Sequence, residues 1–104
     1  MITNQSLPSP ITSFSKCSNK VLPIPKNTFL EVLPVNPNRL YAAFINMSTA
    51  SVTLILGERS DGSITKGIPL TPGGSFEINL INLYRGKVSI TAERDAQISF
   101  IECE

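Results

Sequence analysis

The stretch VNPNRLYAAFIN, residues 35–46, constrains the fold more than any other part of this 104-residue chain. Its Asn-Pro-Asn start is typical of a rigid turn, because asparagine accepts local backbone hydrogen bonds and proline presets its own φ angle. The residues after Arg39 alternate, and both faces are apolar: one carries Leu40, Ala42 and Phe44, the other Tyr41, Ala43 and Ile45. The pattern predicts a corner that leads into a strand covered on both sides and paired with the strand before it.

Further short segments have the alternation or the turn boundaries that are typical of strands. They span residues 28–33, 51–57, 67–70, 75–78, 87–92 and 96–102. No segment of ten or more residues has a helical period. The fold class is therefore all-β: a small antiparallel β-sandwich or barrel of about six or seven strands.

Turn residues and alternation also predict details of this body. Pro69 confines its short strand to a sheet edge, and Asp61-Gly62 predicts a polar hairpin loop over residues 57–67. The segments 87–92 and 96–102 are expected to pair as a hairpin through the polar turn between them. The side chains expected to face the core are Leu30, Val32, Val52, Leu54, Leu56, Phe76, Ile78, Val88, Ile90, Ala92, Ala96, Ile98 and Phe100.

The first 27 residues differ from the rest in composition. They hold four prolines in two Pro-x-Pro pairs and three lysines without an acidic residue, whereas the remainder has six basic and eight acidic residues. Because each proline restricts itself and its predecessor to extended geometry, we expect an extended arm over residues 1–27 and a folded domain over residues 28–104. Apolar residues spaced along the arm indicate that it docks on its own body or on a partner.

Several function classes are disfavoured by what the sequence lacks. A net charge of +1 argues against nucleic acid as a partner, and no apolar run approaches the ~20 residues of a membrane span. Without histidine, Ser–His, Cys–His and zinc sites are not expected. The sequence thus predicts no enzyme and no catalytic, cofactor-binding or metal-binding residue. Cys17 and Cys103 are expected to be free thiols in a reducing compartment, with a disulfide left open.

Five stretches together resemble a known pattern: VNPNRLYAAFIN, LILGE, GIPLTPGGSFEIN, LYRGKVSITA and AQISFIE. They are similar to small β-sandwich structural proteins of tailed bacteriophages, some of which are capsid decoration or cement proteins. The resemblance covers residues 35–102, about two-thirds of the chain, and consists mainly of turn and core residues. It implies a non-enzymatic virion protein on the phage capsid surface, synthesised in the host cytoplasm, with the major capsid protein as partner.

The resemblance and the composition together lead to a two-part expectation for binding. The arm is expected to reach capsid subunits or neighbouring cement molecules. The body is expected to form a homo-oligomer, a trimer near a local threefold axis, through the apolar face Tyr41, Ala43 and Ile45; the alternative for that face is the second sheet of the same sandwich. The expected arm anchors are Leu7, Pro8, Pro10, Ile11 and Phe14.

Two rival functions remain open at this stage. In a phage tail, fibre or baseplate module, residues 57–67 would be presented to a host surface or another tail protein. A small carbohydrate-binding sandwich is the weaker rival, because the chain has no tryptophan and only two tyrosines to stack on sugar rings.

Overall fold

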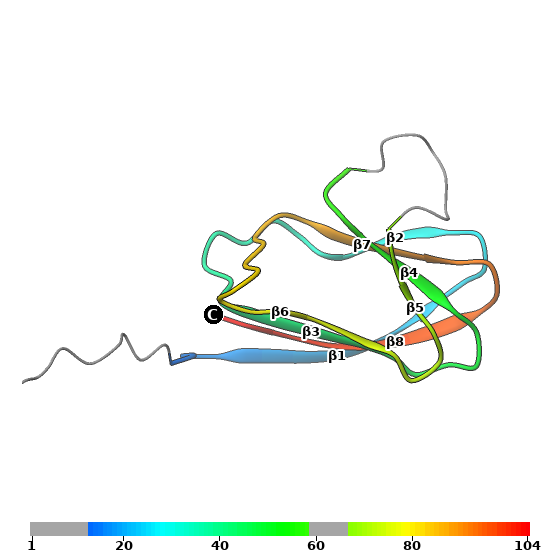
Figure 1. The fold of residues 1–104 in the computed structure, drawn as a ribbon, viewed down its shortest axis with the longest axis horizontal. Coiled ribbons are helices and arrows are strands. Elements are labelled where there is room, and N and C mark those ends of the chain that lie inside the picture. The colour runs from blue at the N-terminus through cyan, green and yellow to red at the C-terminus, as the bar shows by residue number, and fades with distance from the viewer. Residues whose placement is uncertain (1–12, 59–66) are drawn as a thin grey trace, which may run out of the picture.

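Eight strands make up most of residues 13–58 and 67–104, the part of the chain that the computed structural model describes (Figure 1). None of these residues lies in a helix that could cross a membrane. The strands are β1 Cys17–Ile24, β2 Phe29–Leu33, β3 Tyr41–Asn46, β4 Val52–Leu56, β5 Ile68–Leu70, β6 Ser75–Ile78, β7 Val88–Ala92 and β8 Ala96–Cys103.

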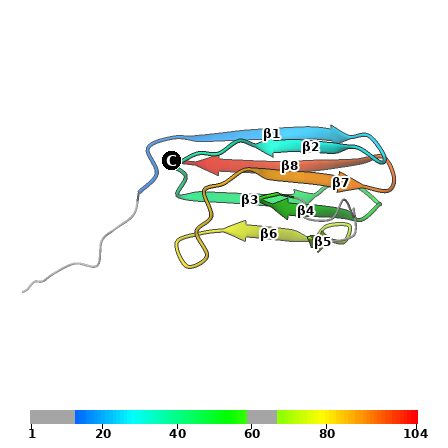
Figure 2. The same cartoon turned by 90° about the horizontal axis from the view of Figure 1, so that it is seen from above.

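The strands form two four-stranded antiparallel sheets that pack as a sandwich. Sheet A has the order β1-β8-β3-β6 and sheet B the order β2-β7-β4-β5 (Figure 2). Only β4 and β5 are neighbours both along the chain and in a sheet, and every other connection crosses from one sheet to the other. This connectivity is that of a jelly roll, a double-sheet fold in which the first and last strands lie side by side.

The core lies between the sheets and contains the side chains that alternation predicts. All thirteen predicted residues belong to the apolar cluster, either buried or partly buried against it. Leu33 and Ile24 lie in the core against expectation. Leu33 turns inward because a register shift between Glu31 and Leu33 interrupts the alternation of β2. Ile24 is contributed by β1, which was not predicted as a strand.

Two predicted strand pairings are wrong. The segments 87–92 and 96–102 do not form a hairpin, because β7 pairs with β2 and β4 in sheet B while β8 pairs with β1 and β3 in sheet A. The corner at residues 35–38 likewise does not return β3 beside β2, since β3 lies between β8 and β6. In both places a short turn carries the chain across the sandwich, which places consecutive strands in opposite layers.

The folded body begins at Cys17, within the segment that the sequence predicts as an arm. β1 is an eight-residue edge strand paired with β8 along its whole length. Lys16 and Glu104 exchange backbone hydrogen bonds of 3.0 and 2.9 Å. Because bonded and non-bonded pairs alternate along an antiparallel ladder, the N–H and C=O groups of every second residue from Cys17 to Pro23 face away from β8. Pro23 stands at one of these outward positions, where the strand needs no N–H group for the ladder. It therefore does not interrupt β1.

The predicted turns are partly confirmed. β4 and β5 pair antiparallel, and β5 with Pro69 is an edge strand, as predicted, while the predicted Asp61-Gly62 turn lies outside the described residues. In the turn after β5, the Gly74 amide donates to the Thr71 carbonyl at 2.7 Å and Gly73 has φ of 77°. These are the features of a type II turn, which requires a positive φ at its third residue.

A disulfide bond joins Cys17 and Cys103, which stand opposite each other on β1 and β8. The expectation of two free thiols is therefore wrong. The two Cα atoms are 4.0 Å apart, because a pair that does not exchange backbone hydrogen bonds brings its side chains closest together. The bond fastens the first strand of the sandwich to the last.

Replacing Cys17 and Cys103 by serine is expected to lower the free energy of unfolding by about 2–4 kcal/mol, because the bond closes a long loop in the unfolded chain. Urea denaturation of the oxidised protein and of the double variant measures the difference. Reduced wild-type protein serves as the control and is expected to match the variant. Equal midpoints for the oxidised and reduced wild type would contradict the prediction.

Candidate interaction surface

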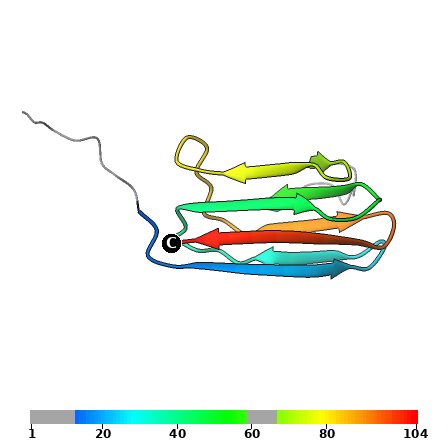
Figure 3. The same ribbon diagram turned by 90° about the horizontal axis from the view of Figure 1, so that it is seen from below.

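The surface of sheet A that faces away from sheet B is poor in charge. Figure 3 views the molecule with the strands of sheet A in front. Ala43 stands opposite Ile101 and Ile45 opposite Ser99, so the side chains of each pair point to the same side of the sheet. We call these residues the outer face: Asn19, Val21, Tyr41, Ala43, Ile45, Ser75, Glu77, Ser99 and Ile101. Among them only Glu77 is charged, and Ile45 is 44% exposed in the middle of the sheet. The outer face is therefore a candidate interaction surface.

The structure places all three residues of the predicted oligomer face on this surface. Tyr41, Ala43 and Ile45 point away from sheet B, since they alternate with the fully buried Ala42 and Phe44. The alternative, that they pack against the second sheet of the same sandwich, is excluded by this direction.

An apolar hollow of about 300 Å³ adjoins the outer face at the start of β3. We call it the end hollow. Phe14 packs one wall, with its ring centroid 5.5 Å from that of Tyr41. The described residues that line the end hollow carry no charge; they are Phe14, Leu40, Tyr41, Asn79, Leu80 and Ile81. Of the five predicted arm anchors, Phe14 therefore lies at this site, while Leu7, Pro8, Pro10 and Ile11 lie outside the described residues.

A hydrogen-bonded turn presents two of these apolar side chains to solvent. Leu80 is 54% and Ile81 96% exposed. The Asn79 side-chain oxygen accepts from the backbone amides of Ile81 at 2.9 Å and Asn82 at 3.4 Å. In return, the Asn82 side-chain oxygen accepts from the backbone amide of Asn79 at 2.8 Å. The Asn82 side-chain nitrogen donates to the Glu77 carbonyl at 3.0 Å. These reciprocal bonds hold the backbone in one conformation, so the exposed pair is ordered before any partner binds.

The sequence analysis did not single out Leu80 and Ile81. The signal was the order Asn-Leu-Ile-Asn: two asparagines three residues apart can each hydrogen-bond to backbone on the other side of a tight turn. The two apolar residues between them, Leu80 and Ile81, then lie at the tip of the turn and stay exposed.

Tyr41 and Glu77 connect the outer face to the end hollow. The Tyr41 hydroxyl donates a short hydrogen bond to the Glu77 carboxylate, which also accepts from the Asn79 amide group at 3.2 Å. These two bonds, the one from Tyr41 first, hold the pKa of Glu77 below its ordinary value, while the bond to Glu77 raises the pKa of Tyr41. The one charged side chain of the outer face is therefore hydrogen-bonded to its own neighbours, Tyr41 and Asn79.

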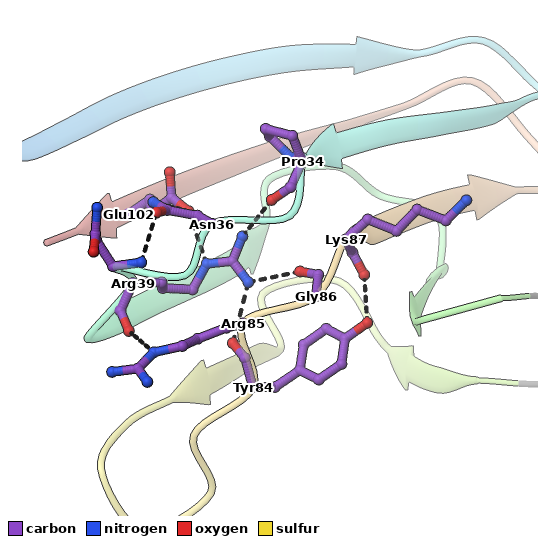
Figure 4. Close-up of polar contacts among 9 residues, drawn as sticks. Pro34, Asn36, Arg39, Tyr84, Arg85, Gly86, Lys87 and Glu102 are labelled. Atoms are coloured by element: carbon purple, nitrogen blue, oxygen red, sulfur yellow. Dashed lines mark hydrogen bonds and ion pairs between the residues drawn. The ribbon is translucent and has the colours of Figure 1, made fainter.

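A buried arginine fixes the connections that build this end of the sandwich (Figure 4). The Arg39 side chain is fully buried, and its Nε donates to Glu102 at 2.7 Å. Its terminal nitrogens donate to the carbonyls of Pro34 at 2.7 Å, Gly86 at 2.7 Å and Tyr84 at 3.1 Å. One side chain thus ties the β2–β3 connection, the β6–β7 connection and the end of β8 together.

Two further hollows have polar linings. One, of about 460 Å³, lies at the opposite end of the molecule, with Thr53, Glu93 and Arg94 among its lining residues. The other, of about 250 Å³, lies beside the 2.8 Å ion pair of Lys87 with Glu58. Within residues 13–58 and 67–104, no three histidine, cysteine or acidic side chains are grouped so that they could hold a metal ion.

Comparison of the chain with protein-family models, with curated proteins and with solved structures found no match.

Replacing Glu102 by glutamine is expected to lower the free energy of unfolding by about 3 kcal/mol, because it leaves the buried Arg39 cation without its counter-charge. Urea denaturation measures the loss. The matched control is Glu104→Gln, which breaks the ion pair with the exposed Lys16 and is expected to change stability by less than about 1 kcal/mol. Similar losses in the two variants would contradict a special role for the buried pair.

Replacing Tyr41 by phenylalanine is expected to raise the pKa of Glu77, because the carboxylate loses its strongest hydrogen bond. A depressed folded-state pKa stabilises the fold above the unfolded pKa, and that stabilisation disappears as pH falls through the folded pKa. The variant should therefore lose less stability on acidification. An NMR titration of the Glu77 carboxyl carbon measures the pKa directly. Tyr84→Phe is the control, since the Tyr84 hydroxyl donates to the Lys87 carbonyl instead.

Proposed function

We propose that this chain is a non-enzymatic structural protein of a phage particle, a decoration or cement protein that stabilises the head by packing against the major capsid protein and against copies of itself. The observation that carries the proposal is the charge-poor outer face of sheet A, which adjoins the apolar end hollow at Tyr41. The sequence resemblance over residues 35–102 supports the same role. The jelly-roll connectivity is compatible with it, although a fold does not by itself imply a function.

The size of the outer face bears on how such a protein would bind. Four strands at about 4.8 Å spacing and about six residues at about 3.3 Å each give a footprint of roughly 400 Å² per copy. A face-to-face pair would then bury about 800 Å², less than the roughly 1,200 Å² of a stable specific interface. The face therefore needs a second contact, and we assign that contact to the N-terminal arm and the end hollow.

The contact through an arm also suits a repeated lattice. Each copy would be held at two linked places, and the second binding event takes place at the high effective concentration set by the first. We propose a trimer as the oligomer, because a closed ring of three copies matches a threefold axis of a capsid lattice.

The proposal is tested by adding the purified chain to phage heads that lack it. Wild-type protein is expected to sediment with the heads at hundreds of copies per particle. Ile45→Glu is expected to reduce bound protein at least tenfold, because it places a charge in the middle of the outer face. The control Val35→Glu adds the same charge at a side chain that is 67% exposed and lies in the β2–β3 connection, and it should bind normally.

The test also separates the proposed head protein from its main rival. A handful of copies per virion, located at the tail, would support a tail, fibre or baseplate module that presents residues 57–67. Equal binding of Ile45→Glu and wild-type protein would show that the outer face is not the contact.

A further inference from the structure

The end hollow lies where the described part of the chain begins. Ser13 is the first described residue, and the next residue, Phe14, packs against Tyr41 and forms part of the lining. One apolar residue of the N-terminal region is thus already bound at this end of sheet A. Twelve further residues precede Ser13 in the sequence.

The lining of the end hollow favours an apolar polypeptide segment over a small polar ligand. Its two polar side chains, Tyr41 and Asn79, both donate to Glu77, and Asn79 also accepts from the Ile81 amide. A site for a small ligand usually offers several free polar groups that orient the ligand, whereas most of this lining is supplied by the apolar residues Phe14, Leu40, Leu80 and Ile81. Because hydrogen bonds already hold the turn, the entropy cost of ordering the receiving surface on binding is low.

The chain itself contains a segment of matching chemistry. Residues 1–15 include no charged side chain, and the apolar residues Ile2, Leu7 and Ile11 are spaced along them. An uncharged segment can enter the uncharged end hollow without leaving a buried ion unpaired. The arm anchors expected from the sequence, Leu7 and Ile11, are therefore suitable occupants.

We propose that the end hollow receives the N-terminal segment of a second copy of this chain, so that copies are joined by exchanged arms. Leu7 and Ile11 of one copy would pack against Leu80 and Ile81 of the next. Pro8 and Pro10 restrict residues 7–10 to extended geometry, which favours a segment that reaches a second copy over one that folds back on its own body. This inference deepens the proposed function and rests on it for its biological role.

The experiment uses full-length protein and sedimentation velocity over a range of concentrations. Wild-type protein is expected to form a concentration-dependent oligomer. The arm variant Leu7→Ser/Ile11→Ser and the hollow variant Leu80→Ser/Ile81→Ser are each expected to weaken self-association at least tenfold. Both hollow substitutions fall on exposed side chains, so the fold is expected to survive, and circular dichroism checks it. Met47→Ser is the control, because Met47 is 57% exposed but follows the opposite end of β3.

Mixing the two variants distinguishes arm exchange from self-association through a different surface. The intact arm of the hollow variant can enter the intact hollow of the arm variant, so the mixture is expected to form a complex of two chains that neither variant forms alone. Wild-type protein that stays monomeric at every concentration would overturn the inference, and so would a mixture that fails to associate. Either result leaves the binding of phage heads through the outer face to be judged by its own test.

Discussion

The guanidinium group of Arg39 holds together the end of the molecule where the proposed contacts lie. Its four hydrogen bonds reach three stretches of chain that belong to different connections, at Pro34, at Tyr84 and Gly86, and at Glu102. A charge can be buried in this way because a counter-charge and several hydrogen-bond acceptors replace the water around it. The β6–β7 connection is thereby anchored at its C-terminal side, and the Leu80–Ile81 turn projects from a fixed base.

At the other end of β3, an uncharged side chain likewise donates hydrogen bonds to buried backbone carbonyls. Asn46 is fully buried, and its side-chain amide donates to the carbonyls of Ala50 at 2.7 Å and Leu70 at 2.9 Å. Its side-chain oxygen accepts from the backbone and hydroxyl of Ser48. A jelly roll sends nearly every connection across its ends, and the carbonyls buried there need donors. Arg39 and Asn46 supply them at opposite ends of one central strand.

The sequence predicted most of the buried apolar side chains but, apart from β4 and β5, not which strands are neighbours. Alternation identifies the inward residues of β7 and β8 because burial acts on each strand separately. Pairing depends on whether a turn stays in one sheet or crosses to the other, and residues 93–95 carry no signal that decides this. β1 was missed because of Pro23. Proline fits a strand only at an edge and only where its nitrogen faces away from the neighbouring strand, and the sequence does not give the register that decides this. The disulfide was missed for the same reason, since it requires Cys17 to stand opposite Cys103.

Hydrogen bonds within the chain already hold the surface around the end hollow, which lowers the entropy cost of binding a second copy there. The end hollow is bounded by β3, which is bonded on both sides, and by a turn whose asparagines bond to each other's backbone. The disulfide fastens the strand that follows Phe14, so the chain enters the site from a fixed point. The surface that would receive a second copy is thus held by bonds within one copy. Because Pro8 and Pro10 restrict the backbone of residues 7–10, the proposed exchange would cost less conformational entropy than the binding of a flexible linker of equal length.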